Sequence, residues 1–225
     1  MDTFESIIQG AAIYALPVIF AITLHEAAHG YIAKHFGDLT AYQAGRISLN
    51  PIKHIDPMGT IIVPLTLFII SKLTMGTGFL FGWAKPVPVN FGQLHHPKRD
   101  MLWVAVAGPA ANLFMACCWA VILKLGAMSF PDNFYATPMI LMGKAGIDIN
   151  LILMVLNLLP LPPLDGGRMV ISLLPSRLAY MFSRIEPYGF MILLFLLITG
   201  ILGAIVWPFI LYMKYVIAWI FGLYI

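Results

Sequence analysis

The sequence has few charged residues. Only 10% of its 225 residues are Asp, Glu, Lys or Arg, whereas 60% are hydrophobic. Soluble domains are roughly a quarter charged, so this composition excludes a soluble enzyme. The abundance of apolar residues also excludes a disordered chain. The only two cysteines, Cys117 and Cys118, are adjacent within an apolar run, which excludes a scaffold held together by disulfides.

Basic residues are scattered through short loops and form no continuous run. A surface for nucleic acid needs such a run, so we expect no nucleic-acid partner. The expected surroundings are a lipid bilayer, in which residues 1–225 form a single integral membrane domain. The sequence leaves the oligomeric state open.

Five apolar blocks are long enough to enter or cross a bilayer, at 6–24, 57–84, 101–123, 137–164 and 187–225. This pattern predicts an all-α polytopic membrane protein with about five to six membrane segments. The first block continues in a helical pattern as far as Gly37, a residue type that commonly ends helices. In the fourth block, Asp148 follows Lys144 by four residues, which favours an ion pair within one helix.

Positive charge is concentrated in three segments, at 34–53, 85–99 and 168–184. The positive-inside rule places all three in the cytosol. A single crossing by 57–84 would separate the first two, so we interpret 57–84 as a re-entrant hairpin or two half-helices. The break is expected near Pro64 or at Gly76 and Gly78.

The last block, 187–225, is longer than one crossing requires, because it would extend about 58 Å as a continuous helix. It fits two short crossings that turn between Gly200 and Pro208. It fits equally well one crossing followed by a helix at the membrane interface, and the sequence does not decide between these arrangements.

The first block ends in His25-Glu26-Ala27-Ala28-His29, which reads HExxH. Residues four apart share one helix face, so His25 and His29 can bind one cation while Glu26 lies near the remaining coordination position. Ionisable groups at membrane depth cost a few kcal/mol and need a compensating partner. Counted back from Phe36, His29 lies about 10 Å from the cytosolic end of the helix. The alternative is a pair of interfacial helix histidines without a metal.

A catalytic zinc ion takes three protein ligands and a water, so a third ligand must come from elsewhere in the chain. Asp165 is the best candidate, because it ends an apolar span and two glycines that permit a sharp turn follow it. Its alternative role is an N-cap for a helix that begins near Arg168. One zinc ion held by His25, His29 and Asp165 would activate water, with Glu26 as the general base, and these roles fit amide hydrolysis.

These residues resemble the site-2 protease family of intramembrane zinc metalloproteases, in its small bacterial form. HEAAH at 25–29 is similar to the zinc-binding motif of the family, and LDG at 164–166 is similar to the tripeptide that supplies its aspartate ligand. The stretches 45–60, 82–90 and 107–112 also resemble smaller members. The resemblance implies a helical membrane core with a short membrane-associated β element after the first motif. It further implies regulated cleavage of a transmembrane protein substrate in the bacterial inner membrane.

The resemblance also implies two residues that bind substrate. Asn157 matches a family asparagine that contacts substrate near the metal, and Asn112 matches a polar position in the helix beside the active site. Each has an alternative role as a hydrogen-bonding residue between helices. We interpret Gly108 as a residue for close helix packing.

A membrane helix must unwind before it is cut, and its freed backbone groups then need new partners. We hypothesise that residues 85–90 lie beside the zinc and bind unwound substrate by strand addition, through Pro86, Val87 and Pro88. Prolines suit an edge or extended segment because they donate no backbone hydrogen bond. The alternative is a proline-stiffened connection between helices.

Two other functions compete with the protease. Intramembrane His, Asp and Glu residues also mark the ion pathways of zinc or proton transporters. The proposed ligands lie at one depth, however, which favours a hydrolase. A relative that binds membrane proteins without cutting them is the second alternative, but a purely structural metal site has no need of a base such as Glu26.

Overall fold

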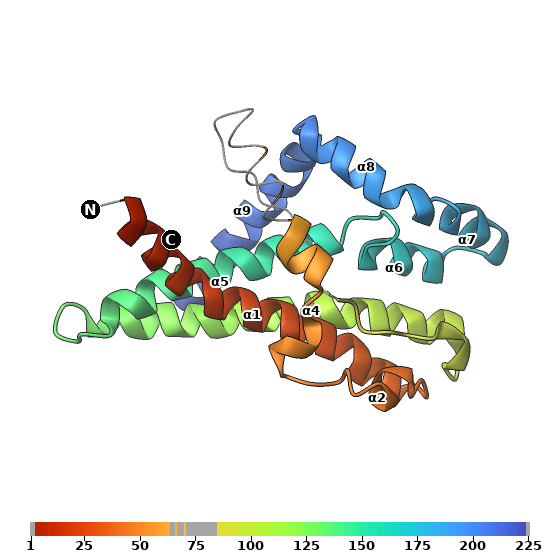
Figure 1. Ribbon diagram of the computed structural model, residues 1–225, viewed down its shortest axis with the longest axis horizontal. Coiled ribbons are helices and arrows are strands. Elements are labelled where there is room, and N and C mark those ends of the chain that lie inside the picture. Colours follow the sequence, from red (N-terminus) through yellow and green to blue (C-terminus); the bar gives the residue numbers. More distant parts are fainter. Residues whose placement is uncertain (1–2, 64–65, 67–69, 71–84, 224–225) are drawn as a thin grey trace.

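The structure is a computed structural model that describes residues 3–63, 66, 70 and 85–223. Within these residues every regular element is helical (Figure 1). The longer helices are α1 (Thr3–His35), α4 (Pro97–Ser129), α5 (Ala136–Asn157), α6 (Asp165–Leu173), α7 (Ser176–Ser183), α8 (Glu186–Ile198) and α9 (Ile201–Phe221). The short ones are α2 (Thr40–Gln43), η1 (Pro51–His54), η2 (Pro57–Ile62) and η3 (Phe91–Gln93).

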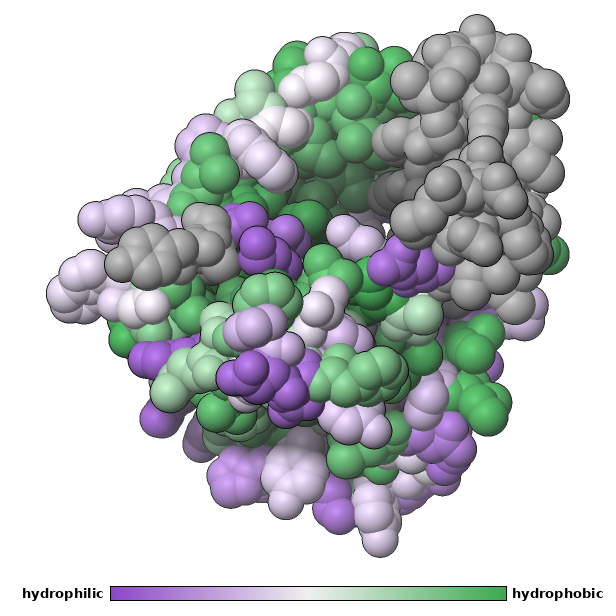
Figure 2. Space-filling view, turned by 90° about the vertical axis from the view of Figure 1, so that its left-hand side faces the viewer, coloured by the Kyte–Doolittle hydropathy of each residue, from purple (hydrophilic) through white to green (hydrophobic). Residues whose placement is uncertain are grey.

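Four helices are long and apolar enough to cross a membrane, and they are α1 over Ala12–His35, α4, α5 and α9. Helices α7 and α8 meet at a bend of 59° and make a fifth span if the pair is counted as one. Large apolar side chains of α8 and α9 face outward, and Figure 2 shows this apolar surface at the top of the molecule. Contact of such a surface with lipid is favourable, whereas its exposure to water is unfavourable. The prediction of a helical integral membrane protein is therefore confirmed.

Helices α1, α4 and α5 pack together along most of their length (Figure 1). A core between α4 and α5 joins Trp119 and Leu123 to Ile147 and Leu151, and residues of α8 and α9 complete it. A Cβ atom on Gly146 would lie 2.2 Å from the Trp119 ring, so α5 can approach α4 this closely only with glycine there. The close packing of these helices fixes the frame that carries the functional residues.

The helix ends follow from glycine and proline. Gly37 follows α1 with a φ of 102°, a conformation that glycine adopts without strain, which confirms the predicted stop. Helix α5 ends at Asn157 and does not continue to 164, because the prolines that follow have no N–H group and cannot extend it. The last block divides into α8 and α9 at Gly200, whose φ is 77°, a division that both alternatives for this block allow.

The expected break in 57–84 lies outside the described residues, because Pro64, Gly76 and Gly78 are not among them. The described part of this block begins with η2. Asp56 caps it by accepting hydrogen bonds from the backbone N–H groups of Met58, at 2.8 Å, and Gly59, at 3.0 Å.

The predicted β element is wrong for the described part of the chain, which contains no strand. Residues 85–90 are extended, but Pro86 and Pro88 have no N–H group to donate to a ladder. Two other N–H groups of the segment donate to side-chain carboxylates, that of Val87 to Glu26 and that of Asn90 to Asp38. The segment therefore binds to side chains beside it and not to a second strand.

The three basic segments lie at one end of the molecule, on the right of Figure 1. The backbone N–H of His95 donates to the Phe36 carbonyl at 2.9 Å, which joins the start of α4 to the end of α1. Lys98 donates to the Leu174 carbonyl, which joins the same region to the end of α6. All three basic segments can therefore lie on one side of a membrane, as the positive-inside rule requires.

The predicted ion pair between Lys144 and Asp148 is wrong. Asp148 Oδ1 lies 2.7 Å from Nζ of Lys214, which belongs to α9, and Lys144 is exposed. An i, i+4 pair gains little, whereas Lys214 lies in the apolar helix α9, where an acidic partner lowers the cost of its charge. The pair thus fastens α9 to α5.

We expect Lys214→Met to lower the thermal midpoint of unfolding in detergent, because Asp148 then loses its partner at a helix interface. The charge swap Asp148→Lys with Lys214→Asp should recover part of the loss, with a coupling energy of about 1 kcal/mol. Lys144→Met is the control and should leave the midpoint unchanged. Equal losses from Lys144→Met and Lys214→Met would contradict the pairing.

Candidate metal centre

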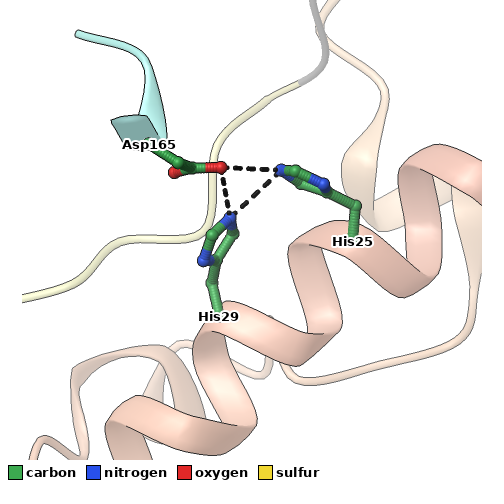
Figure 3. Close-up of side chains that lie close together, drawn as sticks. All are labelled: His25, His29 and Asp165. Carbon is green, nitrogen blue, oxygen red and sulfur yellow. Dashed lines mark hydrogen bonds and ion pairs between the residues drawn. The ribbon is translucent and has the colours of Figure 1, made fainter. Parts of the chain in front are cut away.

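Three buried side chains meet between α1 and the start of α6 (Figure 3). His25 and His29 extend from one face of α1, and their Nε2 atoms lie 3.1 Å apart. Oδ2 of Asp165, the first residue of α6, lies 3.3 Å from each of them. Each of the three residues is at most 7% exposed. In the part of the chain that the structure describes, no other group of three His, Cys, Asp or Glu side chains could hold a metal ion.

Asp165 reaches the histidines because α6 starts tightly against the proline-rich loop before it. A Cβ atom on Gly166 would lie 2.3 Å from the Leu158 carbonyl oxygen, and one on Gly167 would lie 2.3 Å from the Pro162 nitrogen. Only glycine fits at both positions. Asp165 is not an N-cap, since Leu164 takes that place and no side chain caps the helix. The carboxylate is therefore free to face the histidines.

Both histidines are held from behind by oxygen acceptors. Nδ1 of His29 lies 2.7 Å from the Val104 carbonyl oxygen, and Nδ1 of His25 lies 2.6 Å from Oδ1 of Asn112. These oxygens only accept hydrogen bonds, so in a neutral ring Nδ1 carries the proton and Nε2 presents a lone pair. Metal-binding histidines are oriented in this way by their outer partners.

The arrangement fits a small divalent cation. Two Nε2 lone pairs face a carboxylate oxygen that accepts no hydrogen bond from the described residues, and three such atoms repel one another without a positive charge between them. Gly108 of α4 leaves room beside them, because a Cβ atom there would lie 2.4 Å from Nε2 of His29 and 2.6 Å from Nε2 of His25. Two imidazoles and one carboxylate, with a position left for water, are ligands that catalytic zinc takes.

Glu26 lies next to this cluster and is half-buried. Its Oε2 accepts a hydrogen bond of 2.7 Å from the backbone N–H of Val87. The Val87 side chain is buried against α1, where a Cβ atom on Gly30 would lie 3.1 Å from it. Further along, the N–H of Asn90 donates to Asp38 at 2.7 Å. Residues 85–90 therefore run beside the HExxH motif, with Pro86 and Pro88 exposed.

The two asparagines predicted to bind substrate lie in different places. Asn112 is fully buried behind His25 and has its polar atoms engaged within the protein. Asn157 is half-buried at the end of α5, where its Nδ2 donates to the Leu153 carbonyl at 3.0 Å. No hydrogen bond joins Asn157 to the three clustered residues, and its contact with substrate stays a prediction.

Residues 137–200 match the model of Peptidase family M50, a stretch that contains Asp165 but not the HExxH motif. YwhC of Bacillus subtilis, which is named as a zinc metalloprotease, is 37% identical over 201 residues, which cover 86% of this chain and 83% of YwhC.

The chain belongs to peptidase family M50, the site-2 proteases.

Another relative supports this membership. Rip2 of Mycolicibacterium smegmatis, also named as a zinc metalloprotease, is 31% identical over 187 residues, which cover 82% of this chain and 66% of Rip2. No solved structure matches the chain. As an M50 peptidase, the protein is an intramembrane zinc metalloprotease of the site-2 type, as the motifs predict, and nothing in these relatives favours a transporter.

Sequence reasoning missed the role of Gly108 in this M50 peptidase. The interpretation of Gly108 as a residue for close helix packing fits the structure, but it does not indicate that the close approach lies at Nε2 of both histidines. The spacing holds a signal, since Gly108 and Asn112 are four apart and therefore share the face of α4 that meets α1. Val104, whose carbonyl holds His29, lies four residues earlier on the same face.

We expect Gly108→Ala to abolish zinc binding by the purified peptidase, because the added methyl group would occupy the space beside the two Nε2 atoms. The helical circular dichroism signal should persist. Gly203→Ala in α9 is the control, since a Cβ atom there meets nothing within 4 Å. The measurement is the amount of zinc per mole of protein, determined by atomic emission spectroscopy. A full complement of zinc in Gly108→Ala would show that the cation lies elsewhere.

Proposed function

We propose that this site-2 protease hydrolyses peptide bonds in or near the transmembrane segment of membrane protein substrates. One Zn²⁺ per chain is held by His25, His29 and Asp165, and Glu26 is the general base. The observation that supports this proposal is the convergence of two Nε2 atoms and a buried carboxylate oxygen, next to a glutamate that is not one of the three.

When bound, zinc supplies Lewis acidity, which lowers the pKa of a coordinated water and polarises a carbonyl group. Glu26 accepts a proton from the attacking water as the water oxygen bonds to the scissile carbonyl carbon. It then returns the proton to the amide nitrogen as the C–N bond breaks. Because Val87 N–H holds Oε2, the other carboxylate oxygen of Glu26 is left for this transfer.

The substrate segment must be extended when it is cut, because a closed helix shields its peptide bonds. Residues 85–90 are extended and lie against Glu26, which favours them as the surface for the unwound segment. We assign Pro86, Val87 and Pro88 to this surface, where their carbonyl groups would accept hydrogen bonds from the unwound segment, because the N–H group of Val87 donates to Glu26 and the prolines have none. Asn157 remains a candidate for substrate contact, whereas we assign Asn112 to support of His25.

The active site opens near the cytosolic side of the bacterial cytoplasmic membrane. His29 lies within two turns of the end of α1, at the same end of the molecule as the three basic segments. The positive-inside rule assigns that end to the cytosol. The substrate is thus reached from the bilayer, and its cytosolic portion is released.

We expect Glu26→Gln to abolish cleavage of a single-span substrate in proteoliposomes and to leave the zinc content unchanged. Loss of a general base lowers turnover by about 10²- to 10⁴-fold. Glutamine keeps the size of the side chain and an oxygen for the Val87 N–H group. Metal flux into sealed vesicles by the wild type, without proteolysis, would instead support a transporter.

A second prediction concerns the N–H group of Val87. Val87→Pro removes this donor from Glu26 and should lower kcat about 10²-fold, since a misplaced catalytic group costs a factor of this size. Zinc content should stay unchanged. Val87→Ala is the control, because it also changes the buried side chain but leaves the N–H group of residue 87 in place. Equal kcat values for the two variants would show that this hydrogen bond does not position the base.

A further inference from the structure

The two zinc ligands on α1 are held by different kinds of acceptor. His29 donates to a backbone carbonyl, whose oxygen can only accept. His25 is paired with the side-chain amide of Asn112, which could present either its oxygen or its NH₂ group. The tautomer of His25 therefore depends on which way the Asn112 amide is turned, whereas the backbone fixes that of His29.

Two acceptors on other helices set the orientation of Asn112. Its Nδ2 donates to the Ala21 carbonyl of α1 at 3.2 Å and to Oδ1 of Asn150 on α5 at 3.0 Å. Both asparagines are 0% exposed. With both N–H bonds used in this way, Oδ1 of Asn112 is the atom that faces His25.

The amide of Asn150 is oriented in turn by its own helix. Its Nδ2 donates to the Gly146 carbonyl at 2.8 Å, which leaves Oδ1 to face Asn112. The donors thus follow one direction, from His25 to Asn112, from Asn112 to Asn150, and from Asn150 to a backbone carbonyl. Each amide has only one orientation that satisfies its neighbours.

Reversal of Asn112 would have a direct consequence for the metal. Its Oδ1 would then face the oxygens of Ala21 and Asn150, and its NH₂ group would face Nδ1 of His25. The neutral ring would carry its proton on Nε2, the atom that lies 3.3 Å from Asp165. A protonated Nε2 cannot bind a metal ion.

We propose that Asn150 is a positioning residue of the metal centre, which fixes the orientation of Asn112 and through it the tautomer of His25 that binds metal. Asn150 acts at a distance, since its hydrogen bonds join it to Asn112 and Gly146 and not to the proposed ligands or to Glu26. The inference rests on the proposed zinc site and extends it to α5.

A purely structural role for the pair makes a different prediction. Buried amides between membrane helices also stabilise their packing, by about 0.6 kcal/mol on average. If Asn150 only joined α4 to α5, its loss would lower stability without affecting the metal. Zinc affinity and stability must therefore be measured separately.

The test compares three variants of the full chain, purified in detergent. Asn150→Leu has a similar size and no polar atoms. Asn150→Asp is the conservative variant, because a buried carboxyl that keeps its proton can accept from Asn112 and donate to Gly146. Leu151→Ala is the packing control, since Leu151 is 0% exposed beside Asn150 and takes no part in the hydrogen bonds.

Zinc dissociation constants are measured by competition with a chromogenic chelator, and thermal unfolding is followed on the metal-free proteins. We expect Asn150→Leu to bind zinc about tenfold more weakly than the wild type. This is the lower end of the loss that follows when a hydrogen-bond partner of a metal ligand is removed. Asn150→Asp should restore the wild-type value. Leu151→Ala should unfold at a lower temperature and keep the wild-type zinc affinity.

A second measurement needs no variant of Asn150. The ¹⁵N spectrum of the metal-free wild type, labelled at histidine and assigned with His25→Gln, should show His25 protonated at Nδ1. An Nδ1 atom of His25 without a proton would overturn the inference even if Asn150→Leu fails to fold.

The inference is also overturned if Asn150→Leu binds zinc as tightly as the wild type, if Asn150→Asp fails to restore binding, or if Leu151→Ala weakens binding equally. In each case wild-type zinc binding would leave the proposed function intact. A wild type that binds no zinc would instead overturn the zinc site and this inference together.

Discussion

A carboxylate and two imidazole lone pairs converge in an apolar interior, and the rest of the structure depends on this convergence, which the proposed zinc ion would balance. Charge at membrane depth costs several kcal/mol unless it has a partner. Asp165 is distant in sequence from the histidines, so the same attraction that holds the metal also fastens α6 to α1. Metal binding is thereby coupled to the packing of these helices. The glycines at 108, 166 and 167 serve this convergence, because a side chain at any of them would push the elements apart.

Helix α1 carries the two histidines proposed as ligands and the glutamate proposed as the base, and it anchors the segment proposed as the substrate surface. His25 and His29 lie on one face, and Glu26 points about 100° around the helix towards residues 85–90. Val87 and Asn90 each donate a backbone N–H to a carboxylate, that of Glu26 and that of Asp38 just after the helix. These two hydrogen bonds therefore fix the position of residues 85–90 along α1 relative to Glu26. A shift of α1 would move the metal, the base and this segment together, which keeps their mutual geometry constant.

The sequence predicts those parts of the site that depend on local spacing. The HExxH motif and the helix stop at Gly37 follow from helical periodicity, and Asp165 follows from the tight turn after an apolar span. The sequence does not predict which side chains of different helices are in contact. The rule for i, i+4 pairs considers one helix at a time, so it assigned Asp148 to Lys144 when its partner is on α9. The role of Asn112 also requires the third helix, because Asn150 orients its amide. The predicted β element does not form in residues 85–90. The carboxylates of Glu26 and Asp38 accept hydrogen bonds from the N–H groups that a strand would donate to its neighbour.

The direction of the hydrogen bonds behind His25 helps to distinguish a hydrolase from an ion transporter. From His25 they pass through Asn112 and Asn150 and end at the Gly146 carbonyl within α5. Asp148, two residues before Asn150, lies about 200° away around the same helix and faces Lys214 on α9. The hydrogen bonds that start at His25 therefore end within α5 and do not include the partly exposed pair of Asp148 and Lys214. Amide groups in fixed orientations neither ligate zinc in passage nor relay protons, so these hydrogen bonds offer no ion path from His25 to α5. A buried centre bordered by residues 85–90 suits hydrolysis of a substrate segment that reaches it from the bilayer better than it suits the passage of ions.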